Sequence, residues 1–153
     1  MISAQQIKTL RDRTGISIAE CKKALEAEAG NEDRAFTWLK VAGAKIAEKK
    51  STRTLEAGIV SAYIHSTHTL GALVEVRSET DFVAKNDGFR LLADDLAMHI
   101  AALAPQDITE LLEQPFIKDP SQTIADIIKG AIQKFGERIE ISTWNRLDAR
   151  ADV

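Results

Sequence analysis

Three helix start signals, each followed by an apolar stripe and a glycine, fall within the first 43 residues. Ser3 and Ser17 begin S-x-x-Q and S-x-x-E capping boxes, and Asn31 is a suitable N-cap for the third helix. Apolar side chains follow each start at spacings of three and four residues, as on one face of a helix. Glycine favours the left-handed conformation that commonly ends a helix. The three predicted helices end at Gly15, Gly30 and Gly43.

A run of basic residues follows the third predicted helix. Its members are Lys45, Lys49, Lys50 and Arg53. We assign residues 45–56 to a basic helical extension or linker. The bundle before it, residues 1–44, is smaller than the size at which a single hydrophobic core is comfortably stable. We therefore expect the bundle to bind another molecule or to serve as an appendage of a larger domain.

The apolar pattern changes its period after residue 57. Gly58–His65 and Leu70–Arg77 alternate between two faces in steps of two residues, as strands do. The polar residues 66–69 between them predict a β-hairpin. Arg138–Leu147 alternates in the same way near the end of the sequence and predicts a third strand.

Two helices are predicted between the hairpin and the last strand. An apolar stripe runs from Phe89 to Leu103, and Pro120 with a capping box at Thr123–Asp126 introduces the second helix. One further helical turn is expected over Asp107–Glu113. The order predicts an α+β class, in which residues 57–153 form a three-stranded, mainly antiparallel sheet covered by helices on one face. The uncovered face and the sheet edges favour a partner, so we expect this module to be a dimerisation domain.

Charge is distributed unevenly along the chain. Residues 1–55 carry eleven Lys and Arg against seven Asp and Glu, a net charge of +4, whereas the remaining residues carry nine against sixteen, a net charge of −7. Nucleic-acid binding needs a basic face, so the acidic second module disfavours it. The third helix also begins with Glu32 and Asp33, where a DNA-reading helix would contact bases. The basic segment 45–56 leaves one alternative open, a non-enzymatic adaptor that binds protein or nucleic acid.

The sequence favours a cytoplasmic protein. It has no run of ~18 apolar residues such as a membrane-spanning helix needs. The first fifteen residues lack the apolar core of a secretory signal. The single cysteine, Cys21, lies on the inward stripe of the second helix, which indicates a buried and unreactive thiol in a reducing compartment.

Signatures of catalysis and of metal binding are weak. His65 and His68 flank the hairpin turn, but two histidines without a nearby carboxylate or thiol make a poor metal site. Asp94 and Asp95 are adjacent on a helix, so they point in different directions. The sequence contains neither a glycine-rich phosphate loop nor the nucleophile elbow of hydrolases. We therefore predict a protein that is not an enzyme, needs no cofactor or metal and binds no nucleotide directly.

One segment, TDFVAKN (residues 80–86), places a large apolar ring among polar residues. Thr80 and Asp81 can cap a helical turn, which puts Phe82 at a tip between a strand and a helix. Two interpretations are open. Either the ring folds back onto the sheet edge, or it anchors the protein in a partner's pocket, as aromatic residues at binding hot spots do.

At this segment the chain resembles the elongation factor Ts family, and the resemblance covers nearly the whole sequence. The shared segments, in order, are LRDRTG (10–15), CKKALEAEAGN (21–31), the Lys49–Lys50 pair, TDFVAKN followed by Phe89, MHIAA (98–102) and QPFIKDPSQT (114–123). The resemblance implies a guanine-nucleotide exchange factor that promotes GDP release from elongation factor Tu in translation elongation. It also implies a ubiquitin-associated-like bundle that docks on the partner's nucleotide-binding domain.

The resemblance assigns partner-binding roles to individual residues. A loop-helix over residues 80–85, called the 80–85 turn below, enters the partner near its magnesium and phosphates. Its implied members are Asp81 and Phe82 as the wedge, with Thr80, Val83 and Lys85 in support. The residues Met98 and His99 are implied to contact a different domain of the partner.

The chain departs from longer relatives in one respect. Those relatives have two core subdomains and a helical insertion at the place where this chain has only Leu103–Glu113. A single predicted helix, Asp87–Leu103, then carries both the wedge and the MHIAA contact. At about 25 Å long, one copy of it is expected to be too short for two partner domains. We therefore predict a homodimer joined through the second module, in which Phe82 of one chain and His99 of the other act on one partner.

Overall fold

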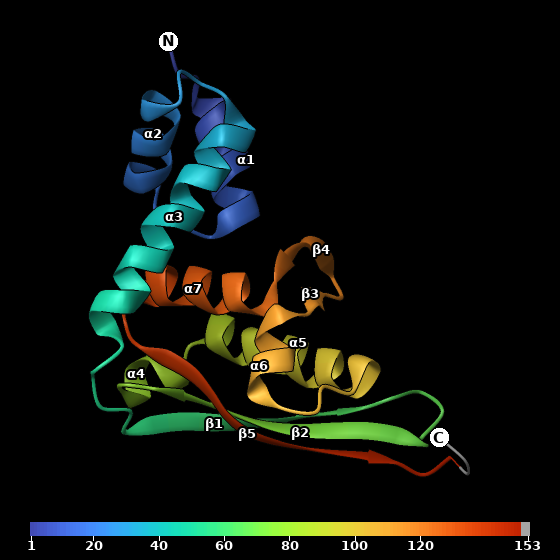
Figure 1. Ribbon diagram of the computed structural model, residues 1–153. Coiled ribbons are helices and arrows are strands. Elements are labelled where there is room, and N and C mark those ends of the chain that lie inside the picture. The colour runs from blue at the N-terminus through green and yellow to red at the C-terminus, as the bar shows by residue number, and fades with distance from the viewer. Residues whose placement is uncertain (151–153) are drawn as a thin grey trace. The chain divides into compact units, whose positions relative to one another are not determined.

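The computed structural model describes residues 1–150 (Figure 1). Residues 1–52 together with 129–136 form one compact unit, and the rest of the described chain forms a second. Within the described residues, no helix is both long and apolar enough to cross a membrane. The predicted combination of N-terminal helices followed by a helix-covered antiparallel sheet is confirmed.

Three helices form most of the first unit, and their starts are those predicted from the sequence. They are α1 (Ala4–Thr14), α2 (Ile18–Ala27) and α3 (Glu32–Lys50). The Ser3 hydroxyl accepts a hydrogen bond from Gln6 N at 3.1 Å, and Gln6 Oε1 accepts one from Ser3 N at 3.0 Å, which completes a reciprocal capping box. The apolar stripes meet in a core of Leu10, Ile16, Cys21, Ala24, Leu25, Ala35 and Leu39.

The prediction that the third helix ends at Gly43 is wrong, because α3 continues through this residue to Lys50. A Cβ atom at position 43 would lie only 2.8 Å from Gln133 Oε1. Gln133 belongs to the second half of α7 (Ile124–Phe135), which is part of the same unit. Gly43 therefore permits close packing of two helices and does not end one. The division of the sequence into residues 1–44, 45–56 and 57–153 stays a prediction.

The second unit is built on an antiparallel sheet with the strand order β1–β2–β5. Its strands are β1 (Ala57–Ile64), β2 (Leu70–Ser78) and β5 (Ile139–Asp148). The strands β1 and β2 form the predicted hairpin, with Ile64 opposite Gly71, and β5 pairs with the other edge of β2. A bulge beside Glu75 and Val76 shifts the register of β5.

The two faces of this sheet have different surroundings. Figure 1 shows α5 over one face and no helix of the described second unit over the other. The covered face buries Ala72, Val74 and Val76 of β2. The opposite face, called the outer face below, exposes the large apolar side chains of Val60, Ile64, Leu73 and Leu147.

Four helices and a small hairpin connect β2 to β5. These are α4 (Asp81–Ala84), α5 (Asp87–Leu103), α6 (Ile108–Glu113), the hairpin of β3 (Pro115–Phe116) and β4 (Asp119–Thr123), and α7. The sequence pattern does not predict the β3–β4 hairpin. The expectation that one helix carries both the wedge and the MHIAA contact is wrong. The helix α4 ends at Ala84, and Asn86 caps α5 as a new helix by accepting a hydrogen bond from Gly88 N.

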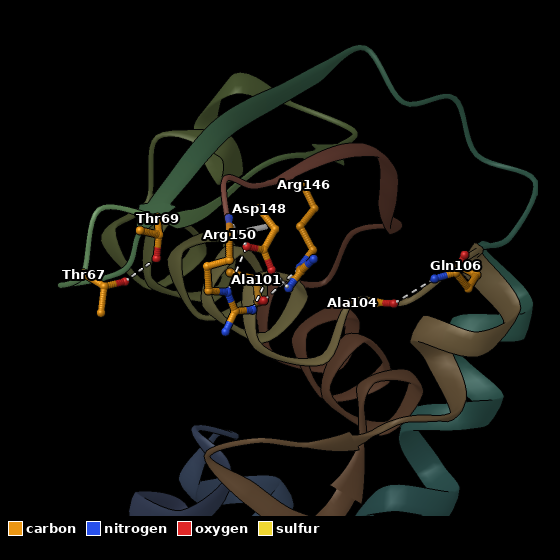
Figure 2. A network of polar contacts seen from close by, with 8 residues as sticks. All are labelled: Thr67, Thr69, Ala101, Ala104, Gln106, Arg146, Asp148 and Arg150. Carbon is orange, nitrogen blue, oxygen red and sulfur yellow. Dashed lines mark hydrogen bonds and ion pairs between the residues drawn. The ribbon is translucent and has the colours of Figure 1, made fainter. Parts of the chain in front are cut away.

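The C-terminal end of α5 is tied to the end of β5 by polar contacts (Figure 2). Helix ends leave carbonyl groups without helical partners, and Arg146 Nε donates to one of them, Ala101 O, at 2.9 Å. The Asp148 carboxylate pairs with Arg146 at 3.6 Å and with Arg150 at 2.5 Å. Hydrogen bonds from the side chain and the backbone N–H of Arg150 hold the pKa of Asp148 well below its usual range. These contacts fix the position of α5 relative to the sheet.

Candidate functional site

The 80–85 turn is held by local hydrogen bonds and by two buried side chains. The Thr80 hydroxyl accepts a hydrogen bond from Val83 N at 3.4 Å, which caps α4 as predicted. Ser78 Oγ, at the end of β2, donates to Thr80 O at 3.0 Å. Val83 and Ala84 are buried. The turn is therefore preformed in the free protein although it contains only four helical residues.

A carboxylate from a distant part of the chain clamps the start of this turn. Glu137, which precedes β5, accepts hydrogen bonds from Thr80 N at 3.0 Å and from Thr80 Oγ1 at 2.7 Å. Glu79 Oε1 in turn accepts one from Arg138 N at 2.8 Å, so both segments contribute a carboxylate. Hydrogen bonds to ionised acceptors are stronger than neutral ones. Glu137 is not predicted from the sequence, because it lies 57 residues from Thr80 and no local pattern marks it.

Phe82 projects from the turn with 85% of its surface exposed. The interpretation in which its ring folds back onto the sheet edge is therefore wrong. Asp81 and Lys85 are also exposed. Burial of this apolar ring by a partner would be favourable, because it would remove apolar surface from water. The geometry suits a binding hot spot.

Met98 and His99 lie on α5, roughly 17 Å along the helix axis from its first residue. Met98 is half-buried, whereas His99 is fully buried. His99 Nδ1 accepts a hydrogen bond from Ile117 N at 3.2 Å, and its Nε2 lies 2.9 Å from Gln114 Oε1. Burial lowers the pKa of His99, although the Gln114 contact opposes this shift. The structure thus separates this pair from Phe82 and gives the histidine two partners within its own chain.

The other candidates from the sequence have separate partners. Cys21 is buried, as predicted, and burial raises the pKa of its thiol. Asp94 is hydrogen-bonded by Ser61, whereas Asp95 pairs with Lys118 at 2.8 Å, so the two carboxylates diverge. Among residues 1–150, no group of three His, Cys, Asp or Glu side chains is placed to hold a metal ion.

Of the basic residues that follow Gly43, the three lysines lie on the last turns of α3, whereas Arg53 lies beyond its end. Lys45 and Lys49 are exposed, and Lys50 Nζ donates to Gly136 O at 2.9 Å within the first unit. Lysines near a helix C-terminus also interact favourably with the helix dipole. The presence of lysines in this basic cluster is therefore explained in part by their stabilisation of α3.

Comparison with known proteins places these residues in a family. A family model described as Elongation factor TS matches residues 79–153. The chain is 36% identical to Elongation factor Ts of Synechococcus sp. (strain CC9605), over 95% of this chain and 87% of that protein. It is 35% identical to Elongation factor Ts of Acetivibrio thermocellus, over 97% of this chain and 90% of that protein.

The alignment with the Synechococcus protein spans 191 positions, which exceeds the 153 residues of the chain. That relative therefore carries residues that this chain lacks. Identity above 30% along nearly the whole chain settles the relationship. The chain belongs to the elongation factor Ts family.

Proposed function

We propose that this protein acts in the cytoplasm to promote the release of GDP from elongation factor Tu. The observation that carries the proposal is Phe82, an exposed aromatic ring on a turn that Thr80 and Glu137 hold in place. Membership of the elongation factor Ts family supports the identity of the partner. Nucleotide exchange makes and breaks no covalent bond, so a binding surface is sufficient and no catalytic residue is needed.

The proposed mechanism is linkage between two binding equilibria. A protein that prefers nucleotide-free elongation factor Tu weakens GDP binding by the same factor by which GDP weakens its own binding. Asp81 and Phe82 form the wedge that enters the partner near its magnesium and phosphates. The capping hydroxyl of Thr80 and the buried Val83 hold the wedge from behind, and Lys85 flanks it. Because the turn is preformed, little binding free energy is spent on ordering it.

A second contact, at the Met98–His99 segment of α5, extends the surface to another domain of the partner, with the exposed part of Met98 as the touching group and the buried His99 behind it. Met98 offers a flexible, partly exposed thioether side chain, which adapts well to a protein surface. It lies on α5, whereas Phe82 lies on α4, and Lys85 and Asn86 separate the two helices. We therefore assign the two contacts on one elongation factor Tu molecule to two copies of this chain.

The outer face of the sheet supports a homodimer in which this is possible. Ile64, Leu73 and Leu147 line a groove of about 440 Å³ on this face together with smaller residues such as Ala62 and Gly71. Contiguous exposed apolar surface of this kind marks interaction sites. Two sheets can stack face to face through such surfaces, and a two-fold axis is the commonest symmetry of soluble oligomers.

Sedimentation at micromolar concentration tests the dimer. The wild type is expected to sediment as a dimer and Leu73→Glu as a monomer, because a carboxylate would be buried in an apolar interface. Ile108→Glu, at an exposed apolar position of α6, is the matched control and should stay dimeric. Mixed dimers of Phe82→Ala and Met98→Ala protomers should recover part of the exchange activity that either variant lacks. A monomeric wild type with full exchange activity would contradict this part of the proposal.

The exposed lysines of α3 support one other function, a non-enzymatic adaptor for protein or nucleic acid. In that case Lys45 and Lys49 dominate the affinity, and binding weakens steeply as the salt concentration rises. An exchange factor depends instead on Phe82 and on the nucleotide state of its partner.

Titration calorimetry against nucleotide-free and GDP-bound elongation factor Tu separates these functions. We expect the protein to bind the nucleotide-free form about 5- to 150-fold more tightly, the usual range of coupling between two ligands. Phe82→Ala should lose most of this preference, and Lys45→Ala, the control for the adaptor, should keep it. Equal affinity for the two forms would contradict the proposed function.

A further inference from the structure

The β3–β4 hairpin needs support from outside its own strands. It contains one strand of two residues and one of five, and an isolated hairpin of this size is not stable in water. Pro115 and Pro120 also lack the backbone N–H with which a strand pairs. The contacts that hold the hairpin are therefore expected to come from the elements packed against it.

His99 of α5 supplies the first of these contacts. Because a backbone N–H only donates, the 3.2 Å bond from Ile117 N makes Nδ1 the acceptor and places the proton on Nε2. Nε2 then donates to Gln114 Oε1 at 2.9 Å. The Phe116 ring lies beside the imidazole, with 6.0 Å between the ring centroids. One buried side chain thus binds the hairpin both before β3 and at the turn between its strands.

A second contact fixes the same turn to the surface of α5. Lys118 Nζ lies 2.8 Å from Asp95 Oδ1. Asp95 precedes Met98 by three residues, so the two side chains are neighbours on the helix surface. Ile117 binds His99 through its backbone N–H and directly precedes Lys118, and 41% of its surface is exposed. The turn of the hairpin therefore presents an apolar side chain next to the helical surface to which Met98 belongs.

We propose that His99 is a positioning residue, which holds the β3–β4 hairpin so that Ile117 and Met98 form one surface for the second domain of elongation factor Tu. This inference rests on the proposed function and deepens it. His99 then acts through the hairpin and not by its own contact with the partner. Loss of the ring would leave Ile117 N–H and Gln114 Oε1 without their partner inside the unit, which favours a loosened hairpin.

Hydrogen–deuterium exchange of the free protein tests the positioning role. We expect the Ile117 amide to lose about five- to hundredfold of its protection in His99→Leu, as for one unsatisfied buried hydrogen bond. The amide of Val76 in β2 serves as the reference for global opening. His99→Asn, which keeps an acceptor near the position of Nδ1, should recover part of the protection, and Gln114→Met should reduce it. Unchanged protection of Ile117 in His99→Leu would overturn the positioning role.

Release of a fluorescent GDP analogue from elongation factor Tu tests the shared surface. His99→Leu and Ile117→Ala should both raise the protein concentration for half-maximal release several-fold and leave the maximal rate unchanged, with His99→Asn between them and the wild type. A loosened hairpin with an unchanged half-saturating concentration would overturn the surface. If the wild type does not accelerate release at all, the proposed function and this surface fail together, whereas the protection of Ile117 still decides whether His99 positions the hairpin.

Discussion

The 80–85 turn and the Met98–His99 pair both belong to the candidate binding surface, yet they are built in opposite ways. In the turn, polar groups form the support and the apolar ring of Phe82 is exposed. On α5, the polar ring of His99 is buried and forms the support. An exposed residue can thus contribute binding free energy directly, whereas a buried residue can determine the shape of the binding surface. Substitution of Phe82 should therefore change mainly the affinity for the partner, and substitution of His99 mainly the free energy of unfolding.

Phe82→Ala gives the largest expected effect on binding. Removal of an aromatic hot spot should weaken the complex with elongation factor Tu by about 2 kcal/mol or more, roughly thirtyfold in affinity. The free energy of unfolding should change by less than about 0.5 kcal/mol, because the ring is exposed in the free protein. The concentration dependence of GDP release and urea denaturation measure the two quantities.

Ile108→Ala is the matched control for this variant. Ile108 is an exposed apolar residue of α6 outside every surface proposed above, so its removal should alter neither quantity. A Phe82→Ala protein that unfolds early and yet exchanges normally per folded molecule would show that the ring is structural.

His99→Leu, in contrast to Phe82→Ala, should have its main effect on the free energy of unfolding. The variant removes the buried ring and leaves two hydrogen-bonding groups unsatisfied in a partly buried site, which costs about 1–3 kcal/mol in the free energy of unfolding. Met98→Leu, a volume-conserving change at the adjacent half-buried position, is the control and should cost less than about 1.5 kcal/mol. Urea denaturation that gives His99→Leu the stability of the wild type would contradict the supporting role of the ring.

The same histidine should make stability depend on pH. Burial lowers the pKa of folded His99 from its ordinary value of 6.5. Below that pH the unfolded chain therefore binds a proton that the folded chain does not bind. The wild type should lose stability as the pH falls from 6.5 towards the lowered pKa, with a slope of up to about 1.4 kcal/mol per pH unit. The difference in unfolding free energy between the wild type and His99→Leu should narrow over this range. A constant difference would show that His99 has the same pKa in both states.

Glu137→Gln should have the smallest effect of the four. The variant keeps one acceptor oxygen for Thr80, replaces the other with an NH2 donor and removes the charge, which should loosen the 80–85 turn by about 1 kcal/mol. GDP release should slow by a few-fold as the wedge becomes less well ordered. Glu140→Gln, on β5, changes an exposed carboxylate that pairs with Arg138, and should leave release unchanged. Equal rates for the two variants would show that the clamp does not support the wedge.

The features that could be predicted from sequence depend on neighbours along the chain. Ser3 and Thr123 cap helices through residues three positions away, and both boxes are present in the structure. The β1–β2 hairpin follows from alternation on either side of a four-residue turn. The exposure of Phe82 agrees with one of the two interpretations that its polar neighbours left open.

The features that could not be predicted depend on residues far apart in the sequence. Glycine is a common residue at helix ends, but the lack of a side chain at Gly43 instead allows close contact with Gln133. Glu137 supports Thr80 from 57 residues away. The β3–β4 hairpin has strands too short for an alternating pattern, and its contacts with His99 and Asp95 come from a helix earlier in the sequence. No local pattern records such tertiary partners.

Stopped-flow release of a fluorescent GDP analogue from elongation factor Tu measures the proposed exchange activity itself. The release rate should rise with the concentration of this protein to a plateau well above the spontaneous rate. Phe82→Ala at the same concentration should return the rate most of the way to the spontaneous value. A release rate that is unchanged at saturating wild-type protein would contradict the account.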